Sequence, residues 1–261
     1  DKKILIWDEQ GLGDTIQFSR FVIDLLNYSK NITFVVNSKL CKILNNLNEK
    51  IQICDYNNVD ESKFDFQIPL CSLPNFLKLE IDKDINFYKL NIVFDKTSNF
   101  NLDPKKYNIG LSWSGNSKYF LDQYRSISFN NFKKILNLKE INFYKLSKDT
   151  TEEESVKIDS IKNLFDVGDN SLYEISNLMN SLDLVISSDT SIIHLAGILN
   201  IKSILLLNYN SDWRWFDDSK STIWYPSIKI LKQNKFDNWT NVFVELEEIL
   251  KNYIYDKKKG Q

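Results

Sequence analysis

Short apolar runs of strand length alternate with amphipathic stretches in the first third of the chain. The pattern predicts strands at residues 4–7, 32–36, 51–54 and 64–68. Between them it predicts helices at about residues 14–28 and 39–47, and a short helix or turn at 72–77. The first of these helices has a predicted buried face of Ile16, Phe18, Phe21, Val22 and Leu25.

The alternation stops at residues 95–107, which are polar and include Pro104, so this stretch is the best linker candidate. It then restarts, with predicted strands at 109–113, 141–146, 184–187, 203–207 and 228–231. Helices are predicted at 129–136, 152–164, 172–181, 190–199 and 239–253. The chain is therefore predicted to be α/β, with two Rossmann-like domains at 1–100 and 106–261 facing across a cleft. The pattern leaves open whether the last helix packs back on the first domain.

Composition narrows the class of protein. Hydrophobic residues make up 43% and charged residues 26% of the chain, as in soluble globular proteins. The net charge of -2 gives no electrostatic reason to bind nucleic acid or an anionic membrane. No apolar run approaches the roughly 20 residues of a membrane span. The chain begins without Met, so we expect a processed or excised piece.

Cysteine usage indicates where the protein works. The three cysteines are an odd number without Cys-x-x-Cys spacing, which favours neither a disulfide framework nor a zinc site. Such usage is typical of a reducing compartment. We expect a cytoplasmic protein with no nucleic-acid partner, no metal site and at most peripheral membrane contact.

Glycine is scarce, with seven in 261 residues against roughly eighteen at average usage. The first candidate site segment holds two of them and reads Glu9-Gln10-Gly11-Leu12-Gly13-Asp14-Thr15. These glycines allow a tight turn and a close backbone approach to a ligand. A dinucleotide fingerprint needs a third glycine where Ile16 stands, so that cofactor is disfavoured. Asp14 is open to two interpretations: a cap of the following helix or a general base.

The second candidate segment is Ser187-Ser188-Asp189-Thr190-Ser191, followed by His194 and Gly197. A predicted strand ends there and a helix begins, and the free N–H groups of a helix start attract anions. The same residue types are ordinary helix caps, which explains them equally well. His194 is the only histidine, and a structural role competes with a catalytic one.

The third candidate segment runs from Gly110 through Ser114, Gly115, Asn116 and Lys118 to Arg125. Lys118 and Arg125 could clamp a phosphate, Arg125 in bidentate fashion; an exposed basic loop is the alternative. A nucleophile elbow is excluded, because Ser114 stands where Gly-x-Ser-x-Gly needs its last glycine.

Aromatic residues mark a fourth segment, Asp212-Trp213-Arg214-Trp215 with Trp224-Tyr225-Pro226. Their rings either stack on a base or sugar of a ligand or pack between the two domains.

Together these segments resemble the family 9 glycosyltransferases, whose best-known members are the ADP-heptose:lipopolysaccharide heptosyltransferases. The chain is most similar to the branch found as a C-terminal module behind tetratricopeptide repeats. Matching stretches follow in the family's order over nearly the whole chain, at 7–18, 64–65, 69–74, 110–116, 125–127, 182–197, 212–215, 224–227 and 231–233.

The resemblance implies a GT-B fold whose N-terminal domain lies on the acceptor side and whose C-terminal domain holds a nucleotide-sugar donor. It implies that Asp14 is the general base, that Arg125 helps to hold the phosphates, and that the stretch around Thr190 embraces the diphosphate. The predicted donor-binding set is Gly13, Ser114, Asn116, Lys118, Arg125, Asp189, Thr190, Ser191 and His194. Ser191 stands where the family usually has glycine.

We therefore expect an inverting sugar transfer that needs no metal or other cofactor. Asp14 takes a proton from an acceptor hydroxyl of a glycan, a lipopolysaccharide or a protein. Arg125 and the helix at 190–199 stabilise the departing diphosphate, and domain closure assembles the site. Two alternatives stay open: a degenerate GT-B scaffold or binding module, and a nucleotide-sugar epimerase.

Overall fold

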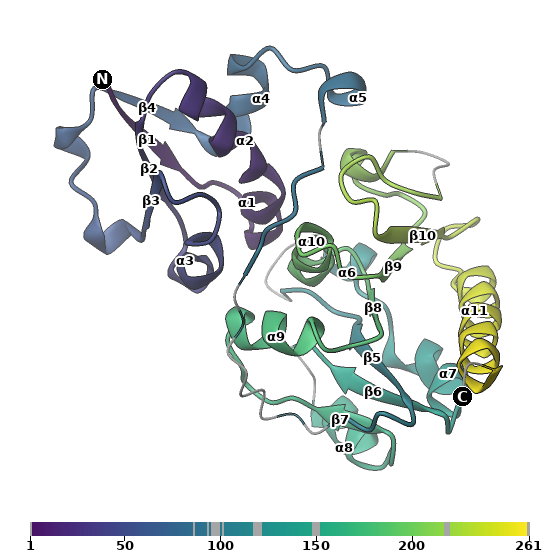
Figure 1. Ribbon diagram of the computed structural model, residues 1–261. Coiled ribbons are helices and arrows are strands. Elements are labelled where there is room, and N and C mark those ends of the chain that lie inside the picture. Colours follow the sequence, from purple (N-terminus) through teal and green to yellow (C-terminus); the bar gives the residue numbers. More distant parts are fainter. Residues whose placement is uncertain are drawn as a thin grey trace.

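The structure is a computed structural model that describes residues 2–85, 87–92, 94, 100, 102–116, 122–147, 152–216 and 220–259. It is α/β, as the sequence pattern predicts, and its strands form two parallel sheets. Figure 1 shows the sheets in separate parts of the molecule, with helices between them and around them. We call the part built on the first sheet the N-terminal half and the other the C-terminal half.

The N-terminal sheet has the strand order β3-β2-β1-β4. Its strands are β1 (Lys3–Trp7), β2 (Asn31–Val35), β3 (Ile51–Cys54) and β4 (Phe66–Pro69). The helices of this half are α1 (Leu12–Phe18), α2 (Arg20–Asp24), α3 (Ser38–Leu44), α4 (Leu73–Phe76) and α5 (Ile81–Asp84). The single helix predicted at 14–28 is divided at Ser19, whose hydroxyl donates to the Ile16 carbonyl at 2.8 Å. Such a local hydrogen bond competes with the helical ladder.

The C-terminal sheet has the order β10-β9-β8-β5-β6-β7. Its strands are β5 (Tyr107–Ser112), β6 (Ile141–Lys145), β7 (Leu164–Asp166), β8 (Leu184–Ser187), β9 (Ser203–Leu207) and β10 (Ile228–Lys232). Its helices are α6 (Asp122–Arg125), α7 (Lys133–Leu136), α8 (Glu152–Asp159), α9 (Leu172–Met179), α10 (Ser191–Ile198) and α11 (Thr240–Lys259). Strands β6 and β7 extend this doubly wound sheet on one side of β5, and strands β8 to β10 extend it on the other side. The strand order therefore reverses between β5 and β8, and such sheets bind ligands at that point.

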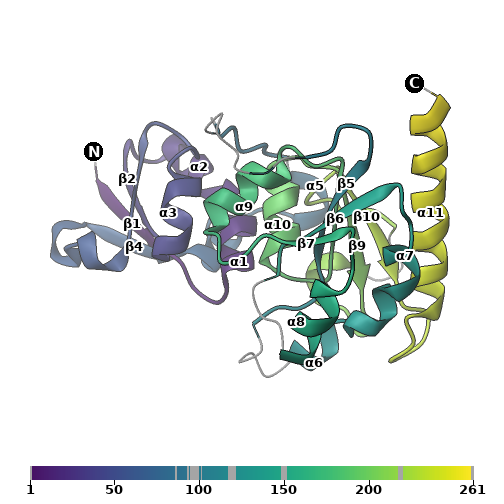
Figure 2. The same cartoon turned by 90° about the horizontal axis from the view of Figure 1, so that it is seen from below.

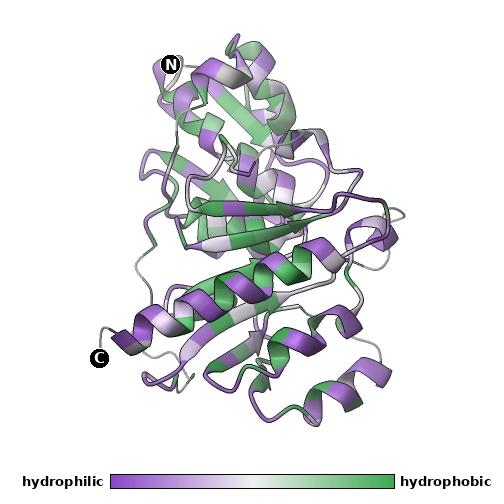
Figure 3. Cartoon of the chain, turned by 90° about the vertical axis from the view of Figure 1, so that its right-hand side faces the viewer, coloured by the Kyte–Doolittle hydropathy of each residue, from purple (hydrophilic) through white to green (hydrophobic). Residues whose placement is uncertain are grey.

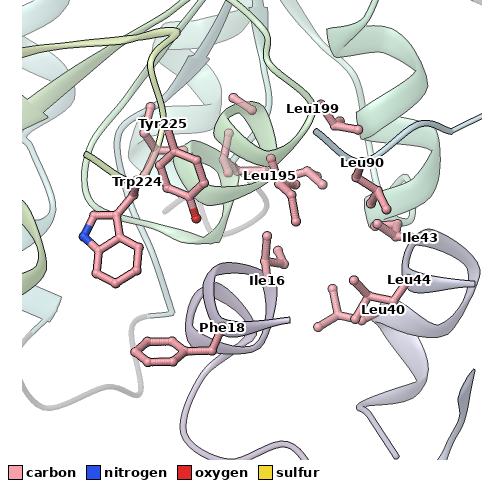
Figure 4. Packing of buried hydrophobic residues seen from close by; sticks show 14 of the residues in the cluster. Ile16, Phe18, Leu40, Ile43, Leu44, Leu90, Leu195, Leu199, Trp224 and Tyr225 are labelled. Atoms are coloured by element: carbon pink, nitrogen blue, oxygen red, sulfur yellow. The ribbon is translucent and has the colours of Figure 1, made fainter. Parts of the chain in front are cut away.

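One hydrophobic cluster crosses from the N-terminal half to the C-terminal half. Helix α1 packs against α10, and α3 packs against α9. In Figure 4, Ile16 of α1 points toward Leu195 of α10, and Phe18 lies below Trp224. Figure 2 shows α1, α9 and α10 side by side between the two sheets. The halves therefore share buried apolar surface, which favours one fixed arrangement.

The last helix packs on the C-terminal sheet. Phe243 of α11 meets Phe132 edge to face at 4.9 Å, and Tyr253 stacks on Tyr107 at 6.0 Å. Figure 3 shows α11 lying along the C-terminal half with apolar and polar positions alternating around it. The alternative that this helix returns to the N-terminal half is therefore wrong.

The connection between the halves is partly described. The Leu90 N–H already donates to the carbonyl of Ile198 in α10 at 2.8 Å, and the Phe94 ring lies 6.3 Å from that of Tyr173 in α9. The chain thus reaches the C-terminal half before the predicted boundary at residue 100. Residues 95–99 and 101 of the predicted linker lie outside the described residues. None of the helices in the described ranges is long and apolar enough to cross a membrane.

Candidate functional site

Asp14 is the third residue of α1, directly after the turn that follows β1. Its Oδ2 accepts the Gly11 N–H at 2.9 Å, so Asp14 caps the helix, as one of its two interpretations predicts. Its Oδ1 lies 2.5 Å from Nη2 of Arg214 in the C-terminal half. The two oxygens of a carboxylate have lone pairs for separate donors, so capping does not exhaust the group.

Arg214 is the residue that sequence reasoning missed. It stands in the short 3-10 helix Trp213–Trp215, and its Nη1 lies 2.9 Å from Oδ1 of Asp212. Burial works against its charge, but the carboxylates of Asp14 and Asp212 outweigh this and raise the pKa of the guanidinium. Its backbone carbonyl accepts the indole N–H of Trp224 at 2.8 Å. Arg214 is therefore a fixed cation that links the C-terminal half to Asp14.

Gly13 lies against His194, with no space between the two helices. A Cβ atom on Gly13 would sit 2.8 Å from Cδ2 of His194, so only glycine lets α1 come this close to α10. The sequence predicted that Gly13 makes room for a ligand, whereas here it makes room for a side chain of the other half. The first two candidate segments are already in contact, so no further domain closure is needed to join them.

His194 is 6% exposed and is held by aromatic rings. Its ring stacks on Trp215 at 5.2 Å, and its Nδ1 lies 3.1 Å from the hydroxyl of Tyr225. Its Nε2 faces Oδ1 of Asp189 at 3.7 Å, which favours a proton on Nε2 and leaves Nδ1 to accept from Tyr225. Burial raises the pKa of the Tyr225 phenol, so this donor keeps its proton.

The end of β8 supplies hydroxyl groups at the start of α10. Thr190 is the residue before the helix, but its side chain makes no capping hydrogen bond. Its Oγ1 lies instead 3.2 Å from Oγ of Ser187 and 3.5 Å from Oγ of Ser112 on neighbouring β5. The Ser188 hydroxyl is buried and has no partner among the described residues. Polar groups thus gather where the strand order reverses, between β5 and β8 and beside the N-terminus of the eight-residue helix α10.

Arg125 is the last residue of α6 and belongs to a hydrogen-bond network with Asp122, Ser126 and Gly115. Its Nε donates to Oδ1 of Asp122 at 2.9 Å, and its side chain is 26% exposed. Ser126 accepts the Gly115 N–H at 3.2 Å and donates to Asp122 at 2.7 Å. A Cβ on Gly115 would lie 2.6 Å from Nη2 of Arg125, so this glycine makes room for the guanidinium. Arg125 is therefore held by these described neighbours, unlike a side chain of the exposed basic loop that was the alternative.

The remaining described members of the predicted donor-binding set lie after β5 and at the start of α10. Ser114 is half-buried and Asn116 is exposed, and both follow β5. Ser191 is the first residue of α10, and its Cα lies close to Gly13. Lys118 lies outside the described residues.

The aromatic segments pack between the halves. Trp224 and Tyr225 are fully buried, and Trp224 lies 6.0 Å from the ring of Phe18 in α1. Arg20 of α2 is 4% exposed and donates to the Trp224 carbonyl at 3.0 Å. The packing interpretation is therefore confirmed for these two rings.

Within the described ranges, no group of three or more His, Cys, Asp or Glu side chains is placed to hold a metal ion. Cys41, Cys54 and Cys71 are free thiols.

No protein-family model matches the chain, and neither does any curated protein sequence. Solved structures do. Escherichia coli ADP-heptose lipopolysaccharide heptosyltransferase II matches at a TM-score of 0.66 and 10% identity, over 98% of this chain and 99% of that chain. A family 9 glycosyl transferase from Veillonella parvula DSM 2008 matches at 0.62 and 11%, over 94% and 91%. A putative UDP-N-acetylglucosamine 2-epimerase from Listeria monocytogenes matches at 0.54 and 10%, over 98% and 90%. The chain thus has the predicted GT-B fold.

Proposed function

We propose that the chain is a glycosyltransferase that moves a sugar from a nucleoside-diphosphate donor to an acceptor hydroxyl. One observation carries the proposal: Asp14, at the carboxyl end of β1, pairs with Arg214 at 2.5 Å, while its neighbour Gly13 touches His194 of α10. The loops at the carboxyl ends of both sheets thus meet at one place, where α/β folds hold ligands.

In the proposed reaction Asp14 is the general base. It takes the proton of the acceptor hydroxyl while the hydroxyl oxygen bonds to the anomeric carbon, and the bond from that carbon to the diphosphate breaks. The cap to Gly11 and the pair with Arg214 hold the carboxylate in one orientation. General-base catalysis contributes roughly 10² to 10⁴ in rate. Attack from the side opposite the leaving group inverts the anomeric configuration.

The departing diphosphate needs stabilisation as it gains charge. We assign this to the N-terminus of α10 and to the hydroxyls of Ser188 and Thr190 beside it. Arg125, at the end of the neighbouring strand β5, adds a cation. Ser114, Asn116, Lys118, Asp189, Ser191 and His194 complete the proposed donor site, which operates without a metal.

An epimerase is the second candidate function, because the Listeria structure has the same fold. It would need a further acid–base pair on the sugar, and the only histidine is held by Trp215 and Tyr225. The Asp14 environment favours transfer, since a single base suffices there. The link to tetratricopeptide repeats stays a prediction from the sequence.

The donor can be found by thermal shift with a panel of UDP-, GDP- and ADP-sugars. A ligand at 100 times its Kd stabilises the fold by about 2.7 kcal/mol, which such a scan detects. Mass spectrometry of candidate acceptors then separates transfer, which adds a sugar mass, from epimerisation, which adds none. If the donor binds but is only epimerised, the transferase proposal is wrong.

Replacing Asp14 by Asn tests the base. We expect transfer to fall by about 10² to 10⁴ while donor affinity stays within a few fold. The amide oxygen of the new side chain can still accept the Gly11 N–H, so the helix cap survives. Asp24→Asn, which changes an exposed carboxylate on α2, is the matched control. Wild-type turnover in Asp14→Asn would remove Asp14 from the mechanism.

A further inference from the structure

A second polar site lies at the carboxyl ends of β9 and β10, and the proposed reaction does not use it. A cavity of about 200 Å3 opens there between the loops that follow these strands and helix α6. Aromatic rings form part of its wall: Tyr124 and Tyr209 are each 47% exposed, and Phe236 is 56% exposed. Large rings left open around one hollow mark a place where a ligand stacks.

The side chain of Gln233, in the cavity wall, has a hydrogen-bond donor without a partner among the described residues. This side chain lines the hollow and is only 4% exposed. Its Oε1 accepts the Tyr209 N–H at 2.9 Å, which fixes the orientation of the amide. Its Nε2 has no hydrogen-bond partner within the part of the chain that the structure describes. An unpaired buried donor costs about 1–3 kcal/mol, and a ligand oxygen in the cavity would remove that cost.

The other polar groups of the cavity select the ligand. Three more amides, of Gln123, Asn208 and Asn210, line it, with the hydroxyl of Ser126. None of the described lining residues is Lys or Arg, and Asp237 is the one charged group among them. These lining residues include no cation to pair with a phosphate or carboxylate. Amides bond the hydroxyls of a sugar in both directions, as donors and as acceptors.

The rings and the amides together suit a sugar residue. The half-exposed rings offer apolar surface for stacking, and the amides beside them can bond the hydroxyls of a sugar. We infer that the cavity is a subsite for a neutral sugar residue, so that the acceptor is a glycan. The acceptor role of this sugar rests on the proposed glycosyltransferase function.

The cavity lies in the C-terminal half, so a glycan acceptor seated there would extend beyond the N-terminal domain, which the resemblance makes the acceptor side. Tyr124 and Ser126 in its wall are the sequence neighbours of Arg125. Asn208 and Asn210 begin the loop after β9 that continues to Arg214. The cavity wall is thus adjacent in the sequence to both arginines of the proposed reaction site.

Saturation-transfer NMR on the whole chain tests the subsite without any donor. The probes are glucose, galactose, mannose, N-acetylglucosamine and maltotriose, with uridine, adenosine and inorganic pyrophosphate for comparison. We expect at least one neutral sugar to bind, and Phe236→Ala to weaken that binding at least tenfold. Phe66→Ala, which removes a ring that is 58% exposed on β4, should leave it unchanged.

Two further variants separate this inference from the proposed function. Gln233→Glu keeps the oxygen that accepts from Tyr209 but removes the unpaired donor, so sugar binding should weaken while the fold is retained. Asp14→Asn should bind the sugar as the wild type does, even if transfer fails for any reason. The subsite is overturned if no probe sugar binds, if Phe236→Ala binds it equally well, or if a nucleoside takes its place.

Discussion

Arg125 and Arg214 each hold an aspartate, but they join different parts of the molecule. Arg125 pairs with Asp122, three residues earlier in the same short helix, and closes a single loop at 2.9 Å. Arg214 pairs with Asp14 from the opposite half of the chain at 2.5 Å, and its side chain is 12% exposed against 26% for Arg125. The Arg125 pair stabilises one short helix, whereas the Arg214 pair holds the two halves of the proposed site together.

The largest effect is expected from Arg214→Ala. It leaves the Asp14 carboxylate, 22% exposed, without its cation, so the free energy of unfolding should fall by about 1–3 kcal/mol. Transfer should fall by roughly 10²-fold, the size of loss seen when one stabilising group is removed from an active site. Arg214→Lys should recover part of both, because it restores the charge without the two-pronged geometry. Steady-state kinetics and urea unfolding measure the two quantities.

The Arg214 prediction has a clear contrary outcome. If Arg214→Ala transfers sugar at the wild-type rate, the long-range pair has only a packing role. The comparison between the two arginines would then lose its functional meaning.

A smaller effect is expected from Arg125→Ala. The change breaks a local pair, so the free energy of unfolding should move by less than about 1 kcal/mol. Affinity for the bare nucleoside diphosphate should fall about tenfold, which corresponds to about 1.4 kcal/mol. Isothermal titration calorimetry with the diphosphate measures this, and Lys133→Ala on the following helix is the control. Equal affinity in the variant and the wild type would remove Arg125 from the phosphate site.

The two arginines also show how far the sequence leads. The apolar runs predict nine strands close to where they lie, because buried parallel strands are near-continuous apolar segments. β7 (Leu164–Asp166) is not predicted, because three residues are too few to show a period. The pattern predicts a helix up to Leu164 instead. The last helix continues to Lys259, six residues past its predicted end, because its final turns face solvent.

The candidate site could be predicted in its parts but not in its pairing. Asp14 and the stretch around Thr190 stand in recognisable strand–turn–helix positions, and the glycines mark close contacts. What Gly13 contacts, however, is His194, and what Asp14 contacts is Arg214. Both contacts depend on how α1 docks on the other half, which no local pattern encodes. The sequence does not single out Arg214, because the aromatic residues on either side of it are the stronger signal in that segment.

A double-mutant cycle on Asp14 and Arg214 tests the central claim, that the two halves form one site through this pair. The variants are Asp14→Asn, Arg214→Gln and the two together, measured by urea unfolding and by single-turnover transfer. We predict that the loss of stability in the double variant is smaller, by at least about 1 kcal/mol, than the sum of the losses in the two single variants. We also predict that its transfer rate is no lower than that of Asp14→Asn alone. Losses that add within about 0.5 kcal/mol, in both stability and rate, would contradict the account.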